Sequence, residues 1–473
     1  MQFRPESLAI AMALALPAAV HAQGFGLNEI GSCAVSRASS TTGAPCLDAS
    51  AIFWNPAAGT RLQKGLTVYG GLASIQVDGD YTADYTTNGK TFRPNIPTSF
   101  PPHLFINWNG SSRYALGLGV YVPYGLTSQW KDDFPGRFAA KRATIATIYT
   151  QPNLSINLTP SWAIGGGPIF AHSTVQLSQS LDLSQQKLPS GGTFLNLGVT
   201  PGTEFGRAFL KGSANGYGFH VGIHGKVGSN IQLGARFLSS INFKYDDANA
   251  RFVQLATNLV VADATTGAAL GGPLTPLPAG TPYDSFLAAQ FRAGGALVSQ
   301  KVKTQITHPG QFEVGFGYTA PTATLLSFDY GYILWNKFKE LPVNFQGPAV
   351  GSSRSLIEDY HNSSSYRFSV EQHFSRYWDI TGRAGFSVTK TPAPDETVTP
   401  LLPDMDRRNF AAGVGLPFGA RYSLDLGYLH VDTQGRRGRI GERTSYSQTA
   451  AQLNTGFYRL NANILSLSLK ASL

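Results

Sequence analysis

Short stretches in which apolar and polar residues alternate recur along most of the chain. In YRFSVEQHF, which starts at Tyr366, the apolar residues Phe368 and Val370 alternate with Arg367 and Glu371. Period-two alternation places the apolar side chains on one face of a β-strand. An apolar face opposite a face with isolated charges is typical of a strand between lipid and a polar lumen. A soluble β-sandwich also alternates, so the connections must decide between the two.

The connections alternate between short and long. Six short turns are predicted near residues 109–112, 159–161, 228–230, 320–323, 375–377 and 416–420. Seven longer, more polar segments lie near residues 79–102, 126–141, 179–216, 246–308, 338–364, 389–408 and 433–455. This is the pattern of periplasmic turns and extracellular loops. Thirteen connections predict an all-β fold, a 14-stranded antiparallel transmembrane β-barrel with both ends on the periplasmic side.

The composition agrees with a membrane barrel. Only 14% of the residues are charged, 12% are aromatic, and there are 52 glycines. Beyond the first residues there is no apolar run of about 18 residues, so no transmembrane helix is expected. The net charge of +9 comes from scattered basic residues and not from a block. We therefore expect no nucleic acid partner, and some basic residues are expected to face acidic lipopolysaccharide.

The first 22 residues have the order of a secretory signal peptide. A short segment with Arg4 precedes the apolar run Leu8–Val20, and Val20-His21-Ala22 is a small-x-small cleavage site. A buried N-terminal helix is the alternative. Cleavage would start the mature chain at Gln23. Together with the barrel pattern, this predicts the outer membrane of a Gram-negative cell.

Residues 23–64 do not alternate and precede the barrel, which is predicted for residues 65–473. A fourteen-stranded barrel leaves a lumen that wall side chains cannot fill. We expect this N-terminal segment to form a plug, or hatch, inside the lumen; a disordered tail is the alternative. The apolar cluster before the first strand is expected to pack inside the barrel and turn toward the wall. Its residues are Ile52, Phe53 and Trp54; Asn55 and Pro56 are expected to turn the chain, and Ala57 follows them in the hatch.

Both cysteines of the chain, Cys33 and Cys46, lie in this segment. Export to an oxidising compartment favours a disulfide between them, and two free thiols are the alternative. The spacing alone offers no further ligands for a metal ion.

The last strand changes its phase. In FYRLNANILSLSLKASL the apolar residues fall on even positions up to Ile464 and on odd positions from Leu465. A β-bulge between Ile464 and Leu465 would account for the change.

Three stretches give a more specific identification. GFGLNEIGSCAVSRA, DASAIFWNPAAGTRL and VPYGLTSQW resemble the FadL/TodX family of outer-membrane transporters of long-chain fatty acids and hydrocarbons. The similarity runs over the whole mature chain and includes PDMDRRNFAAGVG. The resemblance implies an N-terminal hatch inside a fourteen-stranded barrel. It assigns Phe25, Leu27, Asn28 and Glu29 to that hatch.

The third predicted strand contains a proline. Pro123 has no N–H for the ladder, and Gly125 permits a bend. From the residues alone, Pro123 is read more readily as the end of the strand. The resemblance instead implies an inward kink at Pro123, Tyr124, Gly125 and Leu126 that leaves a lateral opening in the wall.

The resemblance also implies a capture groove on the loops 179–216 and 246–308, which are unusually apolar for exposed segments. Short helices are predicted near residues 255–262 and 285–293. Gln179 and Glu358 stand where family members that bind fatty acids have basic residues. Arg354, Lys337 and Lys339 are the alternative candidates for holding a carboxylate.

These features predict passive uptake of hydrophobic compounds, either long-chain fatty acids or neutral aromatic or aliphatic hydrocarbons. Capture in the loop groove would be followed by lateral release through the kink. A surface structural or adhesive barrel and an ordinary hydrophilic porin are the alternatives. No catalytic motif, cofactor or metal site is expected. The expected partners are a hydrophobic small molecule, outer-membrane lipid and lipopolysaccharide, and the protein is expected to be a monomer.

Overall fold

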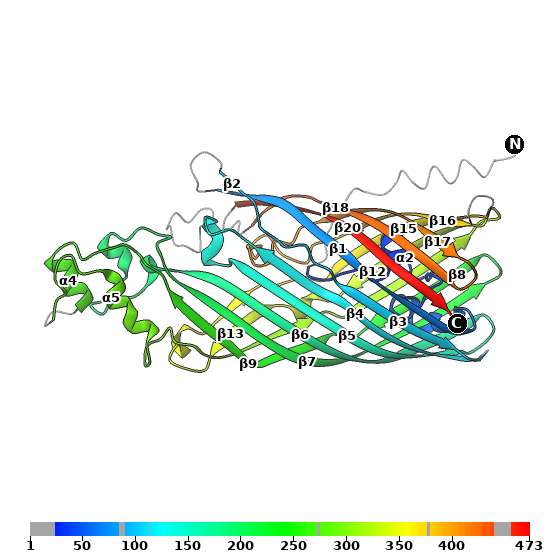
Figure 1. Cartoon of the computed structure of the whole chain (residues 1–473), viewed down its shortest axis with the longest axis horizontal. Helices are drawn as coiled ribbons and strands as arrows, with labels where there is room; N and C mark the ends of the chain where they lie inside the picture. The colour runs from blue at the N-terminus through cyan, green and yellow to red at the C-terminus, as the bar shows by residue number, and fades with distance from the viewer. Residues whose placement is uncertain (1–23, 85–89, 112, 272–274, 376–378, 439–455) are drawn as a thin grey trace.

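Strands make up most of the chain from Gly65 onward (Figure 1). The computed structural model describes residues 24–84, 90–111, 113–271, 275–375, 379–438 and 456–473. The predicted signal peptide lies outside these residues, and so does most of the predicted loop 433–455.

The strands follow one another along the chain and are separated by turns and loops. In chain order they are β1 (Gly65–Ala83), β2 (Thr91–Phe92), β3 (Pro102–Asn109), β4 (Tyr114–Gln129), β5 (Arg142–Asn157), β6 (Trp162–Asp182), β7 (Glu204–Val227), β8 (Ile231–Leu238), β9 (Ile241–Gln254), β10 (Gln300–His308), β11 (Gln311–Thr319), β12 (Thr324–Ile333), β13 (Glu340–Phe345), β14 (Arg354–Ile357), β15 (Ser363–Phe374), β16 (Ile380–Thr389), β17 (Arg407–Phe418), β18 (Tyr422–Thr433), β19 (Arg436–Gly438) and β20 (Gly456–Ser472).

The wall is a closed antiparallel barrel of 14 strands, as predicted. β8 and β9 form one wall strand, because both pair with β7. β10 and β11 form the next, because they pair with β9 and β8 respectively. The last strand closes the ring on the first, from the pair Thr67–Ser472 to the pair Ala83–Gly456.

Outward and inward side chains differ as the alternation predicts. On β7, Phe219, Val221 and Ile223 are exposed on the outer face, whereas His220 and His224, at alternate positions, are buried. An exposed apolar band of this kind is suited to lipid. No helix among the described residues is both long and apolar enough to cross a membrane.

The predicted bulge in the last strand is wrong. β20 pairs with β1 without any shift in register along its whole length. Its even positions face inward throughout, and only the chemistry of that face changes. Leu460, Ala462 and Ile464 line a cavity. Ser466 and Ser468, which follow them toward the C-terminus, form hydrogen bonds with the N-terminal segment. The phase change therefore marks a ligand-sized apolar space and not a backbone irregularity.

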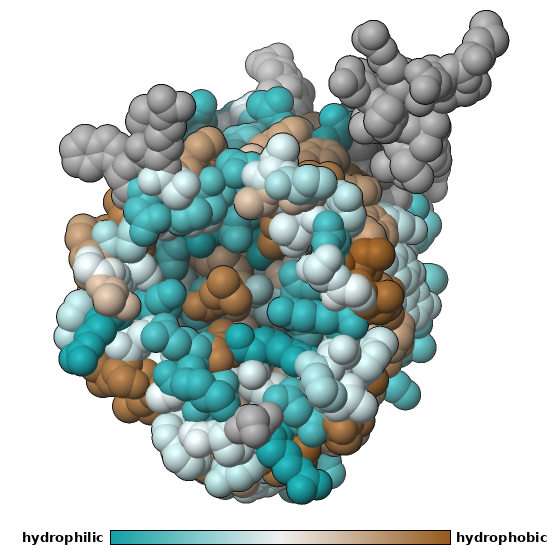
Figure 2. All heavy atoms as spheres, turned by 90° about the vertical axis from the view of Figure 1, so that its right-hand side faces the viewer, coloured by the Kyte–Doolittle hydropathy of each residue, from teal (hydrophilic) through white to brown (hydrophobic). Residues whose placement is uncertain are grey.

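The N-terminal segment, residues 24–64, lies inside the barrel toward the end with the short turns. It forms α2 (Ser32–Ser36), α3 (Ala51–Trp54) and the 3₁₀ helix η1 (Pro56–Arg61), and α2 is visible between the strands in Figure 1. The end-on view of Figure 2 shows atoms filling this end of the barrel, with hydrophobic residues near the centre.

The longest loops pack together at the opposite end (Figure 1). The strands extend further than predicted, so the loops are residues 183–203 and 255–299 and not 179–216 and 246–308. Leu183, Phe194, Tyr283 and Leu287 belong to a buried apolar cluster that joins the two loops. The helix predicted near residues 255–262 is not formed. The loop helices are η3 (Leu183–Gln185), η4 (Phe194–Leu197), α4 (Ala264–Gly271), α5 (Tyr283–Leu287) and η5 (Ala288–Phe291).

Two other connections at this end, β4–β5 and β12–β15, carry short 3₁₀ helices. These are η2 (Pro135–Phe138), η6 (Trp335–Lys337) and η7 (Val350–Ser352). The connection between β12 and β15 also holds β13 and β14, which pair with each other.

Candidate functional site

Strand β4 continues past Pro123 but contains a bulge there. Tyr121 pairs with Tyr149 on β5, and Tyr124 pairs with Thr147, so β4 has one residue more than β5 between these pairs. Proline cannot donate to the ladder, which makes it a natural position for such an irregularity. As a result Tyr121 and Tyr124 are both fully buried on the inner side.

The wall is incompletely paired beside this bulge. The ladder between β3 and β4 ends at the pair Leu104–Val120, although β4 continues to Gln129 toward the end of the barrel with the long loops. β1 likewise extends beyond its ladder with β3. The stretch 93–101 crosses the space between β1 and β4. Three backbone hydrogen bonds join it to β1: two between Ile75 and Ser99, of 2.9 and 3.1 Å, and one from the N–H of Ala73 to the carbonyl oxygen of Pro101, of 3.2 Å. The N–H of Asn95 also donates to the carbonyl oxygen of Gln129 at the end of β4 (2.8 Å).

The start of the N-terminal segment bonds to β4 at the bulge. The N–H of Leu27 donates to the carbonyl oxygen of Pro123 (2.8 Å), and the N–H of Gly125 donates to that of Phe25 (3.0 Å). Residues 25–27 thus satisfy backbone groups that β3 leaves unpaired. A Cβ at Gly125 would lie 2.9 Å from Leu27 Cδ1, so glycine permits this close approach.

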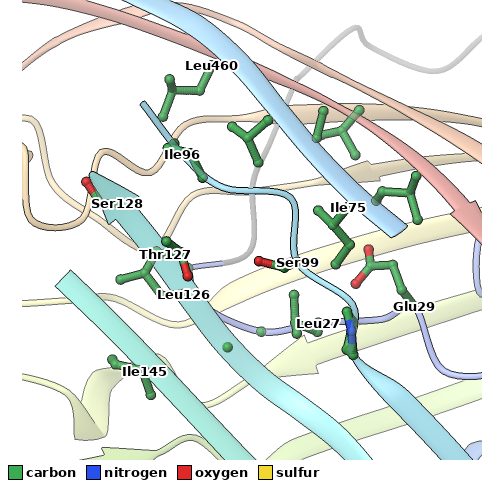
Figure 3. A pocket seen from close by; sticks show the side chains of 18 of the residues that line it. Leu27, Glu29, Ile75, Ile96, Ser99, Leu126, Thr127, Ser128, Ile145 and Leu460 are labelled. Carbon is green, nitrogen blue, oxygen red and sulfur yellow. The ribbon is translucent and has the colours of Figure 1, made fainter. Parts of the chain in front are cut away.

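A cavity of about 500 Å³ lies between the N-terminal segment, β1, β4, β5, β20 and the loop before β17. Most of its lining is apolar. Figure 3 shows Leu27, Ile75, Ile145 and Leu460 around it, with Glu29 at one side. An apolar space of this size is typical of a site for a hydrophobic small molecule.

The cavity reaches both faces of the wall. Ile145 and Thr147 line it from the buried inner side of β5. Ala146 and Ile148 also line it, although they face outward and Ile148 is 47% exposed. Residues from both faces of β5, and Ser99 and Phe100 of the stretch between β1 and β4, therefore line the cavity beside the bulge in β4.

Three charged side chains line the cavity: Glu29, Asp404 and Arg407. Arg407 Nη2 donates to the carbonyl oxygen of Gly24 and to Asp404 Oδ1, both at 3.1 Å. Oε2 of Glu29 is shielded from solvent and has no hydrogen-bond partner among the residues that the structure describes. Burial raises the pKa of Glu29, and the charge of Arg407 opposes this effect.

Phe25 fills an aromatic cage at the inner side of the bulge. Its ring centroid lies 4.7 Å from that of Trp335, 5.5 Å from His308, 5.6 Å from Phe338 and 6.0 Å from Tyr124. The Tyr124 hydroxyl donates to the carbonyl oxygen of Pro309 (2.7 Å), which connects the bulge to the wall strand formed by β10 and β11.

The apolar cluster that precedes η1 is buried in the lumen. Phe53 packs against Tyr121, with ring centroids 4.8 Å apart. Trp54 Nε1 donates to the carbonyl oxygen of Ile30 (3.0 Å). The Asn55 side chain donates to the carbonyl oxygen of Ile223 on β7 (2.9 Å). Pro56 and Ala57 follow it and are buried as well.

The opposite side of the N-terminal segment is held by a buried charge network that sequence reasoning missed. Glu313 pairs with Arg236 (2.7 Å) and Arg367 (3.0 Å), and it accepts a hydrogen bond from the Thr42 hydroxyl (2.7 Å). Asp329 accepts from the backbone N–H of Thr42 (2.6 Å). The isolated charges on the polar faces of the strands are the sequence feature that could have predicted this network. The sequence does not say which of them meet.

The remaining residues of the predicted hatch also contact the wall or one another. Cys33 and Cys46 form a disulfide, with sulfur atoms 2.04 Å apart. The carbonyl oxygen of Asn28 accepts from the Ser39 hydroxyl (3.0 Å).

The three predicted head-group residues do not line the cavity. Arg354 is exposed, and its Nη2 donates to Gln179 Oε1 (2.8 Å). Lys339 is paired with Asp359 at 2.6 Å, and Lys337 is exposed. Glu358 is buried, and burial raises its pKa. Among the described lining residues Arg407 is the only basic one, and it lies in the stretch PDMDRRNFAAGVG.

Comparison with known proteins agrees with this architecture. A family model described as "Outer membrane protein transport protein (OMPP1/FadL/TodX)" matches residues 13–472. The chain is 25% identical over 444 residues to a long-chain fatty acid transport protein of Escherichia coli O6:H1, covering 90% of this chain and 91% of the relative. It is 21% identical over 499 residues to outer membrane protein P1 of Haemophilus influenzae, covering 98% and 99%.

Solved structures share the fold. A Pseudomonas aeruginosa FadL homologue superposes with a TM-score of 0.73 at 20% identity, covering 95% of this chain and 100% of that one. The toluene transporter TodX of P. putida superposes with a TM-score of 0.63 at 14% identity, covering 94% and 99%.

Proposed function

The chain belongs to the OMPP1/FadL/TodX family of outer membrane transport proteins, and we propose that it releases hydrophobic compounds sideways into the membrane through the cavity beside the β4 bulge. It is a passive transporter of the outer membrane and not an enzyme. The proposed substrates are long-chain fatty acids or neutral aromatic or aliphatic hydrocarbons, in line with the names of its relatives.

The observation that carries the proposal is the cavity that both inner and outer side chains of β5 line. A hydrophobic molecule gains about 25 cal/mol for each Å² of its surface that leaves water. The apolar lining offers this gain, whereas a water-filled channel does not. A side exit also delivers the molecule to lipid without contact with water.

The N-terminal segment is the proposed hatch. Its contacts with strands around the barrel favour a plug that stays in place while substrate passes beside it. This arrangement favours lateral release over the hydrophilic porin, which requires an open lumen.

Arg407 is proposed to bind the carboxylate when the substrate is a fatty acid, in place of Arg354, Lys337 and Lys339. Its guanidinium lines the cavity, and an arginine can bind a carboxylate through two parallel hydrogen bonds. The loops 183–203 and 255–299 are proposed to carry the capture groove, and the barrel is proposed to act as a monomer in contact with outer-membrane lipid and lipopolysaccharide.

The test is to block the outer mouth of the cavity. Ala146→Trp places a large ring on the outer face beside the cavity, and we expect uptake of a labelled fatty acid and of labelled toluene to fall at least about tenfold. Ala412→Trp, an equally exposed outward position on β17, is the matched control. Uptake that is equal in the two variants, with both barrels assembled, would exclude this exit route.

A further inference from the structure

The upper parts of three neighbouring strands carry basic side chains on their outer face. The basic patch consists of Lys211 on β7, Lys244 and Arg251 on β9, and Lys301 and Lys303 on β10, all of them exposed. The residues next to them in sequence are mostly buried, as expected for outward positions on a barrel wall.

The patch lies above the apolar band. On β7 the exposed apolar residues run from Val227 to Tyr217. With a strand rise of about 3.3 Å and a tilt of about 40°, this range spans roughly 25 Å of height, which is the thickness of the band in such barrels. Lys211 then lies about 15 Å beyond the band on the side of the long loops. This is the level of lipid head groups and the sugars attached to them.

The strand register brings the basic residues together. Lys211 and Lys301 both pair with Asn249, from its two sides. Neighbouring strands are about 4.8 Å apart, so these two lysines are separated by about 10 Å at the backbone. On the same face, Lys244 pairs with Gln305, and Lys303 is at the irregular step of the β9–β10 ladder.

Most of this charge is not neutralised. Among the described residues, Lys211, Lys244 and Lys303 form no ion pair. Lys301 is 3.5 Å from Asp247, whose side chain is 92% exposed. Asp246 is the other exposed acidic residue on β9. The patch therefore has five basic residues against these two carboxylates.

The opposite side of the barrel differs at the same height. β1 carries Asp78 and Asp80 on its outer face, and β18 carries Asp432. Arg459 on β20 is paired with Asp80 at 3.2 Å. Lys390, Arg408 and Arg459 are also exposed on this side. The three aspartates balance their charge, whereas in the basic patch five basic residues face two carboxylates.

We propose that the basic patch binds the phosphate groups of lipopolysaccharide in the outer leaflet. Lysine ammonium groups bind phosphate as point charges, and their attraction to anionic lipid is strongest within a Debye length of the surface. The inference locates the contact with lipopolysaccharide included in the proposed function, and it does not depend on transport.

The test uses the full-length protein in detergent micelles. Binding of hexa-acylated lipid A with two phosphates is compared with binding of the same lipid A after removal of both phosphates. We expect the wild type to prefer the phosphorylated form. We expect Lys211→Gln/Lys244→Gln/Lys303→Gln to weaken that binding at least about tenfold, at up to about fivefold for each lysine.

The control is a variant with the same loss of charge elsewhere on the outer face, Lys390→Gln/Arg408→Gln/Arg459→Gln. It should retain binding within about twofold of the wild type, and the toluene uptake of both triple variants should be unchanged. Equal binding of the two lipid forms, or an equal loss in both variants, would overturn the proposal. A variant that loses uptake but binds lipid A normally would count against the proposed transport function and would leave the lipopolysaccharide site unaffected.

Discussion

Arg407 is held in place by a carboxylate and a backbone carbonyl. Asp404 and Gly24 accept from the same nitrogen, Nη2. Within the described part of the chain the other guanidinium nitrogens have no partner and are available to a ligand, and Glu29 lines the same cavity with an oxygen that is unpaired there. A single residue can therefore decide whether the cavity accepts a charged head group.

We predict that Arg407→Gln lowers uptake of a long-chain fatty acid about tenfold, because a hydrogen bond between charged groups contributes about 1.5–3 kcal/mol. Uptake of toluene should change less than about twofold. Both rates are measured in cells that lack other transporters of this kind. Lys339→Gln is the control, because Lys339 is exposed and lies outside the cavity. An equal fall for both substrates would exclude the head-group role.

Asp48 is a buried carboxyl of the N-terminal segment. Burial, and then the charge of Asp425, raise the pKa of Asp48 from 3.8 to about 6. A carboxyl with a raised pKa in the folded protein binds its proton more tightly there than in the unfolded chain. Its contribution to stability is therefore fully present below pH 3.8 and is lost as pH rises toward about 6.

We predict that Asp48→Asn removes this part of the pH dependence. Between pH 4 and 7 the free energy of unfolding of the wild type should fall by on the order of 3 kcal/mol more than that of the variant. The introduced amide keeps a side-chain oxygen that can accept from Ser50, as the carboxyl of Asp48 does. Thermal unfolding across this pH range measures the difference, and parallel curves for the two proteins would contradict the prediction.

At the scale of the element, β4 is regular before the bulge at Pro123 and loses its pairing with β3 beyond it. The extra residue between Tyr121 and Tyr124 shifts the alternation, so both tyrosines point inward. It also separates the upper half of β4 from β3, and residues 25–27 take up the unpaired backbone groups. One proline therefore sets the position of the cavity and of the start of the N-terminal segment.

We predict that deletion of Pro123 straightens β4. The alternation would become regular, because Val122 would pair opposite Ile148 between the two retained pairs. Uptake should fall at least about tenfold while the barrel still assembles. Assembly is checked by the heat-dependent mobility of the protein on gels, and uptake with a labelled substrate. Deletion of Ser111 in a short turn is the control. Normal uptake by an assembled barrel that lacks Pro123 would show that the bulge is not needed.

At the scale of the whole molecule, the N-terminal segment contacts the wall very closely. Glycines on inward faces allow this contact. A Cβ at Gly315 would lie 2.2 Å from the backbone nitrogen of Gly43, and one at Gly165 would lie 2.1 Å from the carbonyl oxygen of Pro56. Serines, carboxylates and arginines of the wall then bond to the segment. The abundance of glycine in the chain is partly explained by this fit.

We predict that the wild type conducts ions poorly in planar bilayers and that Gly315→Ala conducts several times more, because the added methyl group displaces the segment from the wall. The same change should lower the free energy of unfolding by about 1–3 kcal/mol. Gly351→Ala, where nothing lies within 4 Å of the added atom, should match the wild type. High conductance of the wild type would contradict a closed lumen.

Much of the fold follows from local patterns. Period-two alternation gives the strands, and the sequence of short and long connections gives the number of wall strands and their direction. These features depend on residues close together in the chain. The predicted limits of the loops are less accurate, because strand residues that extend beyond the membrane need no apolar outer face and so do not alternate. The phase change in β20 predicts a bulge that does not form for a related reason: the inward residues Leu460, Ala462 and Ile464 face an apolar cavity.

The sequence by itself determined the antiparallel barrel of 14 strands and the position of its irregular proline, since backbone pairing and side-chain direction are set by near neighbours. Only the tertiary structure decided which inward groups meet. Glu313 joins Thr42 from 271 positions away, and Arg407 joins Gly24 from 383 positions away. Such contacts form when the ring closes around the N-terminal segment. The alternation within each strand does not indicate which distant residues then meet in the lumen.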